Sequence, residues 1–133
     1  MFLLDTNVVS ELRRPRPNPG VTRWIDATPD HRIYLSAVTI GEVQAGIEIS
    51  RERDPSKADA LEKWLVQVLF SHRILPMDTE AFRVWARLEQ GRPESLLEDA
   101  MIAATAEVHG LTVVTRNVRD FRQLGVKVLD PFV

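Results

Sequence analysis

Short apolar runs that end at polar residues or turns recur along the chain and predict buried β-strands. The expected strands cover residues 2–4, 33–36, 73–75, 112–115 and 126–129. Leucine, isoleucine and valine dominate these runs, and continuous apolar runs between turn signals are typical of strands in parallel sheets. We therefore expect a mostly parallel central sheet of about five short strands.

Most of the segments between these runs repeat apolar residues every three or four positions, which is the spacing along one face of an α-helix. In residues 58–70, for example, Leu61, Trp64, Leu65 and Val68 share a face. Strands that alternate with helices favour an α/β fold, and the chain contains no repeat or linker, so we expect residues 1–133 to form a single domain. The other expected helices cover residues 8–12, 21–27, 39–50, the segment between Asp78 and Gly91, residues 95–109, and a short segment from Asn117.

Composition narrows the classes of protein that the chain can belong to. The formal net charge of −2 argues against a generally basic nucleic-acid binder, although arginines outnumber lysines and three of them cluster at Arg13, Arg14 and Arg16. The chain has no cysteine, which excludes thiolate metal sites and a cysteine nucleophile. Without a secretory signal or a long apolar run, we expect a cytoplasmic protein with no membrane partner.

Polar residues that follow the expected strands are the first candidates for chemistry. Asp5 follows the first strand, Asn117 follows the fourth, and Glu42 is expected in the first turn of the helix after the second. In parallel α/β sheets, ligands bind beyond the carboxyl ends of the strands. We therefore expect these three residues to meet at one edge of the sheet.

Asp99 is the acidic residue that is hardest to explain by structure alone. Its neighbours at helical spacing, Leu96, Ile102 and Ala103, place it on an apolar helix face. A buried carboxylate without a partner costs several kcal/mol, so Asp99 has to be paired, protonated or bound to a metal ion. A hydrogen bond from a backbone amide or an arginine is the non-catalytic alternative.

Helix capping offers a second interpretation of the other candidates. A capping box joins a polar residue at the helix start with an acidic residue three positions later. The chain has three such pairs: Thr39 with Glu42, Ser95 with Glu98, and Asn117 with Asp120. We assign Glu98 to capping, and Asp5 can also cap a helix, but capping does not explain why several of these groups converge on one edge of the sheet.

Clustered carboxylates favour metal chemistry, because they resist ionising together unless a cation is present. Mg²⁺ prefers oxygen ligands and supports phosphodiester hydrolysis by activating water and neutralising phosphate charge. An aspartate after the first strand can also act as the nucleophile of a phosphotransfer enzyme. Such enzymes typically carry a second aspartate two residues later, where this chain has Asn7.

Separated motifs of the chain resemble the PIN-domain family. They are the opening Leu-Leu-Asp5-Thr6-Asn7, Glu42 in Thr-Ile-Gly-Glu-Val, Asp99 in Glu-Asp-Ala-Met-Ile-Ala-Ala, and Thr115-Arg116-Asn117-Val-Arg-Asp120-Phe. Their order and spacing look closest to the VapC-type toxins of type II toxin–antitoxin systems. The resemblance implies a PIN-like fold and an endoribonuclease that depends on Mg²⁺ or Mn²⁺.

The resemblance also implies roles and partners. Metal ligation would fall on Asp5 and Asp99, with Glu42 completing the acidic site; the expected substrate-binding residues, all within the matching motifs, are Thr6, Asn7, Thr115 and Arg116. The implied partners are an RNA substrate, a second copy of the chain and an antitoxin that blocks the site and binds DNA.

The chain departs from the family pattern at its fourth acidic position. Many relatives have an acidic residue where this chain has Asn117, and Asp120 is the nearest residue that can supply the missing charge. This departure favours the alternative, a non-catalytic RNA- or partner-binding module with a degenerate metal site.

Overall fold

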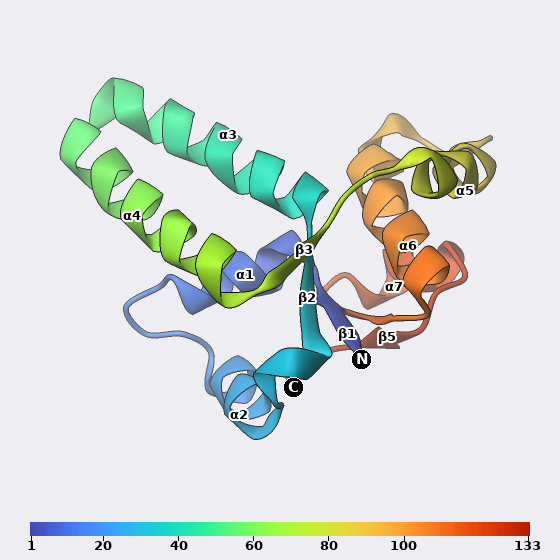
Figure 1. Ribbon diagram of the computed structural model, residues 1–133, viewed down its shortest axis with the longest axis horizontal. Helices are drawn as coiled ribbons and strands as arrows, with labels where there is room; N and C mark the ends of the chain where they lie inside the picture. Colours follow the sequence, from blue (N-terminus) through green and yellow to red (C-terminus); the bar gives the residue numbers. More distant parts are fainter.

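A fully parallel sheet of five strands forms the centre of the computed structural model, which describes residues 1–133 (Figure 1). The strands lie in the order β3-β2-β1-β4-β5. Their bounds are β1 Phe2–Leu4, β2 Ile33–Ser36, β3 Arg73–Leu75, β4 Thr112–Val114 and β5 Val128–Leu129. The expected α/β class and parallel sheet are thus confirmed.

Seven α-helices flank the sheet, and in Figure 1 they form two groups on opposite sides of it. Helices α3 and α4 form a long pair on one side, with α1 and α2 below them, and α5 and α6 pack together on the other. The bounds are α1 Thr6–Leu12, α2 Pro19–Ala27, α3 Ala37–Arg53, α4 Pro55–Ser71, α5 Thr79–Glu89, α6 Leu97–His109 and α7 Val118–Gln123, with short 3-10 turns at Asp30–Arg32 and Glu94–Leu96. None of these helices has both the length and the apolar character needed to cross a membrane.

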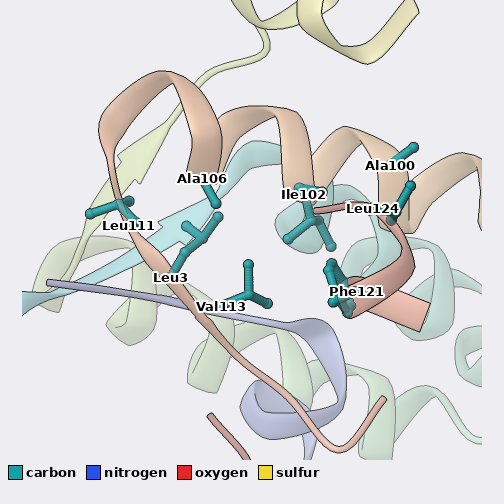
Figure 2. Close-up of a cluster of buried hydrophobic side chains, with 9 residues drawn as sticks. Leu3, Ala100, Ile102, Ala106, Leu111, Val113, Phe121 and Leu124 are labelled. Atoms are coloured by element: carbon teal, nitrogen blue, oxygen red, sulfur yellow. The ribbon is translucent and has the colours of Figure 1, made fainter. Parts of the chain in front are cut away.

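Successive side chains of each short strand point to opposite faces of the sheet, and this divides the core into two main layers. Leu3 and Val113 point toward α6, where they meet its small alanines and the aromatic ring of Phe121 (Figure 2). Their neighbours in the strands, Leu4 and Val114, face the opposite layer with the apolar residues of α1 and α2. Both faces of the sheet are therefore covered, which explains why the strands are continuous apolar runs rather than alternating ones.

Some helices and strands begin or end a few residues from the positions expected from the hydrophobic pattern, because capping and turn residues set their ends. Helix α4 begins at Pro55 because Asp54 caps it, with the Asp54 side chain accepting from the Lys57 amide at 3.1 Å. Strand β5 is shorter than expected, since the chain is still leaving the turn at Gly125, whose φ is 80°. Helix α6 ends as expected at Gly110, in the left-handed conformation that glycine adopts without strain.

The strand order predicts the place for a ligand beside β1. The chain adds β2 and β3 on one side of β1 and then adds β4 and β5 on the other, so the direction of winding reverses between β1 and β4. Loops that leave such neighbouring strands diverge at their carboxyl ends and open a ligand-binding crevice. Asp5 and Thr115 lie directly after β1 and β4, at this point.

Candidate active site

Asp5 occupies the junction between β1 and α1 and is almost fully buried, with 3% of its surface exposed. One carboxylate oxygen accepts a hydrogen bond from the Thr6 amide at 2.8 Å. The other accepts from the Thr115 hydroxyl at 2.8 Å and from the Asn7 amide group at 3.2 Å. Burial raises the pKa of Asp5, and the bonds from Thr115 and Thr6 oppose that rise. Asp5 therefore caps α1. Its carboxylate is also held by Thr115, which follows a second strand, and capping does not require that contact.

Thr115 joins the loops that follow β1 and β4. Its buried hydroxyl donates to Asp5 and accepts from the Asn117 amide at 2.8 Å. The Asn7 side-chain carbonyl accepts from the Arg116 amide at 3.3 Å. Asn7 and Thr115, expected as substrate-binding residues, thus use their polar groups within this network. The Arg116 guanidinium instead stacks on Phe132, 3.9 Å from the ring centroid.

Glu42 reaches the site from α3, and not as part of a cap. The expected capping box at Thr39 and Glu42 is wrong, as is the placement of Glu42 in the first helical turn. Because Ser36 ends β2 and accepts from the Val38 amide at 3.0 Å, α3 begins at Ala37 and Thr39 is buried inside it. Glu42 therefore lies one turn further along.

The carboxylate of Glu42 is held at the rim of the site by α1. It accepts a hydrogen bond from the Thr6 hydroxyl at 2.8 Å, and that hydroxyl also bonds to the hydroxyl of Thr39 at 3.1 Å. Partial desolvation raises the pKa of Glu42, the Thr6 bond opposes the rise, and the charges of Asp5 and Glu98 add to it. Thr6, another expected substrate-binding residue, thus positions an acidic side chain of the site.

Asp99 is half-buried in the first turn of α6 and has the most perturbed pKa of the site. Desolvation, and to a smaller extent the charges of Asp5, Asp120, Glu42 and Glu98, together raise its pKa from 3.8 to about 7. No hydrogen bond or cation lowers it. Neither the bond from a backbone amide nor the pairing with an arginine that the sequence allowed is present at Asp99.

Glu98 is an acidic residue of the site rim that sequence reasoning assigned to capping. That assignment is wrong, because the chain first forms the 3-10 turn Glu94–Leu96 and α6 then begins without any side-chain cap. The exposed Glu98 lies close enough for its charge to raise the pKa of both Glu42 and Asp99. Its position next to Asp99, in the same helical turn, is the sequence signal that could have indicated this.

The last expected capping box, at Asn117 and Asp120, is also absent. Asn117 precedes α7 without accepting a capping bond, and its own amide donates to Thr115 instead. Asp120 lies in the first turn of α7, where its charge raises the pKa of Asp99. Asn117 is exposed, whereas Asp120 is half-buried and electrostatically linked to the acidic cluster.

The acidic residues therefore converge on one edge of the sheet from separate elements: Asp5 from β1–α1, Glu42 from α3, Glu98 and Asp99 from α6, and Asp120 from α7. Their charges oppose one another, as the pKa shifts of Glu42 and Asp99 show. With the side chains as they stand, no group of three acidic or histidine residues is arranged to hold a metal ion.

Comparison with known proteins gives a consistent picture. The family model for the PIN domain matches residues 2–127. Toxin FitB of Neisseria gonorrhoeae is 38% identical, with 99% of each chain covered. The VapC ribonuclease Y4jK of Sinorhizobium fredii is 36% identical, covering 99% of this chain and 98% of its own.

Solved structures agree with these relatives over the whole chain. The crystal structure of FitAcB from Neisseria gonorrhoeae superposes with a TM-score of 0.88 at 36% identity, covering 99% of both chains. Further matches include a toxin–antitoxin complex from Klebsiella pneumoniae and a DNA-bound VapBC from Salmonella typhimurium. The chain therefore belongs to the PIN-domain family, among relatives that are VapC and FitB toxins of toxin–antitoxin systems.

Proposed function

We propose that this chain is a metal-dependent endoribonuclease, the toxin component of a type II toxin–antitoxin system, which hydrolyses RNA phosphodiester bonds at the carboxylate cluster. The observation that carries the proposal is Asp99, whose pKa is raised to about 7 by desolvation and by acidic neighbours, with no hydrogen bond or cation to lower it. Strongly perturbed carboxylates in a crevice are typical of catalytic sites. Relatives named as toxins and ribonucleases support the same activity.

The donor set fits a hard divalent cation such as Mg²⁺ or Mn²⁺. Carboxylate oxygens are the ligands that these ions prefer, and a cation removes the mutual repulsion of the cluster. Asp5, oriented by Thr6 and Thr115, and Asp99 would hold the ion. When bound, it would supply a Lewis acid that neutralises phosphate charge and lowers the pKa of water.

The remaining acidic residues have separate roles in this proposal. Glu42, anchored by Thr6 and with a raised pKa, is suited to accept a proton from the attacking water. Asp120 supplies the charge that Asn117 lacks, because the carboxylate of Asp120, and not the amide of Asn117, acts on Asp99. The proposal includes a homodimer, and an antitoxin that covers the site and links the complex to DNA. Related structures that are a toxin–antitoxin complex and a DNA-bound VapBC support the antitoxin and the link to DNA.

Neutralising the two ligands tests the activity. We expect Asp5→Asn and Asp99→Asn each to lower the rate of RNA cleavage in Mg²⁺ by at least ~100-fold, a typical loss for a catalytic group. Asp26→Asn, at an exposed position on α2, is the matched control and should cleave like the unmodified chain. Circular dichroism checks that each variant is folded. Full cleavage by folded Asp99→Asn would contradict the proposal.

A non-catalytic module that binds RNA or a protein partner is the second candidate, and the uncharged, exposed Asn117 is the observation that favours it. Calorimetric titration with Mn²⁺ separates the two. The nuclease binds the ion, with affinity lost in Asp99→Asn, whereas a chain that binds RNA but no divalent ion is the binding module.

A further inference from the structure

A polar pocket of about 140 Å³ opens beside Glu42, between α1, α3 and α4. Thr6, Ser10 and Arg13 line it from α1 and the end of that helix, Gly46 and Ser50 line it from α3, and Lys57 lines it from α4. Only three hydrophobic residues contribute to the lining. The pocket is therefore continuous with the acidic site but differs from it in its chemistry.

Helical spacing makes this pocket a groove with two different ends. Thr6, Ser10 and Arg13 follow one another at steps of four and three residues, so they lie on one face of α1. Glu42, Gly46 and Ser50 repeat every four residues along α3, which corresponds to a length of about 12 Å. Because the Thr6 hydroxyl donates to Glu42 at one end, Arg13 and Ser50 lie at the other, near Lys57.

The two cations of the groove have no acidic partner. Arg14, next to Arg13, pairs with Glu11, and Arg51 pairs with acidic residues of α3 and α4. Like most basic residues of the chain, Arg13 and Lys57 are exposed and form no salt bridge, so both are free to contact an anion. Two free cations and two serine hydroxyls in one groove match the charge and the acceptor oxygens of a phosphate.

Gly46, within α3, lines the groove as well. Glycine is unfavourable inside a helix, and Gly46 has no left-handed backbone that would require it. A Cβ at this position would meet no atom within 4 Å, so internal packing does not require glycine either. What glycine provides at this position is free space in the groove beside Glu42.

From these observations we propose that the groove is a phosphate-binding subsite for the RNA strand, next to the bond that is cut. Arg13 and Lys57 contact a backbone phosphate, Ser10 and Ser50 donate hydrogen bonds to it, and Gly46 leaves room for the adjoining sugar. The inference rests on the proposed ribonuclease function, since the acidic end of the groove is that proposed active site. Cations and hydroxyls that outnumber the hydrophobic residues favour RNA over an apolar segment of a protein partner.

The double variant R13Q/K57Q tests the subsite against the matched control R16Q/K63Q, which removes the same charge from exposed residues outside the groove. The probe is a fluorescein-labelled, mixed-sequence single-stranded RNA, with binding measured by anisotropy at several salt concentrations in an Asp99→Asn background. We expect R13Q/K57Q to weaken binding about tenfold and to reduce the salt dependence by about 0.7 in log–log slope for each lost phosphate contact. In the cleaving chain, KM should rise while kcat is retained.

Gly46→Leu tests the space itself without removing a charge. We expect it to raise KM severalfold, whereas Gly41→Ala, at an open helical position outside the pocket, should not. Gly46→Ala serves as a smaller step of the same kind, and thermal melting verifies that each variant is folded.

The outcomes separate this inference from the proposed function. If the unmodified chain cleaves RNA but R13Q/K57Q binds and cleaves like R16Q/K63Q, the subsite is wrong and the ribonuclease function stands. If the unmodified chain does not cleave, but its RNA binding still depends on Arg13 and Lys57, the proposed function fails and the subsite stands. Loss of antitoxin binding with unchanged RNA binding would assign the groove to the protein partner and overturn the inference.

Discussion

At the scale of single residues, hydroxyl groups decide where the acidic side chains of the site stand. Thr115 holds Asp5 from the loop after β4, and Thr6 holds Glu42 from the start of α1. Asp99 has no such anchor, and its raised pKa reflects desolvation and nearby charge alone. The cluster thus combines two oriented carboxylates, Asp5 and Glu42, with others, among them Asp99, whose oxygens no donor in the chain occupies.

Replacing Thr115 with valine should show how strongly Asp5 depends on the Thr115 hydroxyl. Thr115→Val removes a donor to Asp5 and the acceptor for the Asn117 amide in a buried place, so we expect a loss of about 1–3 kcal/mol in the free energy of unfolding. Since the Thr115 bond lowers the pKa of Asp5, its loss should also move the pH profile of RNA cleavage to higher pH. Urea denaturation and pH–rate profiles measure the two effects.

Thr115→Ser is the matched control, because serine keeps the hydroxyl and removes only a methyl group. It should retain the pH profile of the unmodified chain. Identical pH profiles for the valine and serine variants would show that the hydroxyl does not set the pKa of Asp5.

At the scale of elements, capping-box patterns were a poorer guide to the site than the ends of the strands. The pairs at Thr39 and Glu42, and at Ser95 and Glu98, have the form of capping boxes, yet neither starts a helix. Ser36 caps α3 before Thr39 is reached, and the 3-10 turn Glu94–Leu96 includes Ser95. A capping pattern shows which backbone amide a side chain is able to bond. Whether that bond forms depends on where the preceding element ends.

Two glycines in helices should respond to alanine in opposite directions. A Cβ at Gly20, in α2, would lie 2.5 Å from the backbone oxygen of Pro131, whereas one at Gly41, in α3, would meet no atom within 4 Å. We expect Gly20→Ala to lower the free energy of unfolding by about 1–3 kcal/mol through overpacking. Gly41→Ala should raise it by up to ~1 kcal/mol, because alanine favours helix.

Chemical denaturation of both glycine variants gives the comparison directly. A stabilising effect of Gly20→Ala would mean that the chain end moves away from α2 at little cost. In that case the contact between α2 and the last residues of the chain would not contribute to stability.

At the scale of the whole molecule, the acidic cluster makes folding stability depend on pH. The pKa of Asp99 is 3.8 as an ordinary aspartate and about 7 in the folded chain, so the folded state holds its proton more tightly. The folded state is then penalised as the group ionises, and its stability falls as pH rises from about 4 to about 7. Asp5 and Glu42 shift in the same direction and add to this trend.

Thermal unfolding in the presence of a chelator measures this dependence. We expect Tm to fall as pH rises through this window, and to fall less for Asp99→Asn, which cannot ionise. Asp26→Asn, at an exposed position outside the site, should retain the full dependence. Equal pH dependence in Asp99→Asn and the unmodified chain would show that Asp99 is not the titrating group.

The sequence by itself determined the sheet, most of the helices and most residues of the acidic site, though not Glu98. Apolar runs such as residues 2–4 have few ways to be buried other than as strands, and the carboxyl ends of parallel strands meet at one edge, so Asp5 and the loop after β4 had to approach each other. The apolar neighbours of Asp99 likewise indicated a carboxylate that is difficult to ionise.

Only the tertiary structure decided how those residues work together. The hydrogen bonds from Thr6 to Glu42 and from Thr115 to Asp5 join positions that are far apart in the chain. The charge that Glu98 and Asp120 exert on Asp99, and the groove with Arg13 and Lys57, depend on how α1, α3, α4, α6 and α7 pack. The physical reason is that burial and the direction of a side chain are properties of packing, which local spacing along one element does not contain.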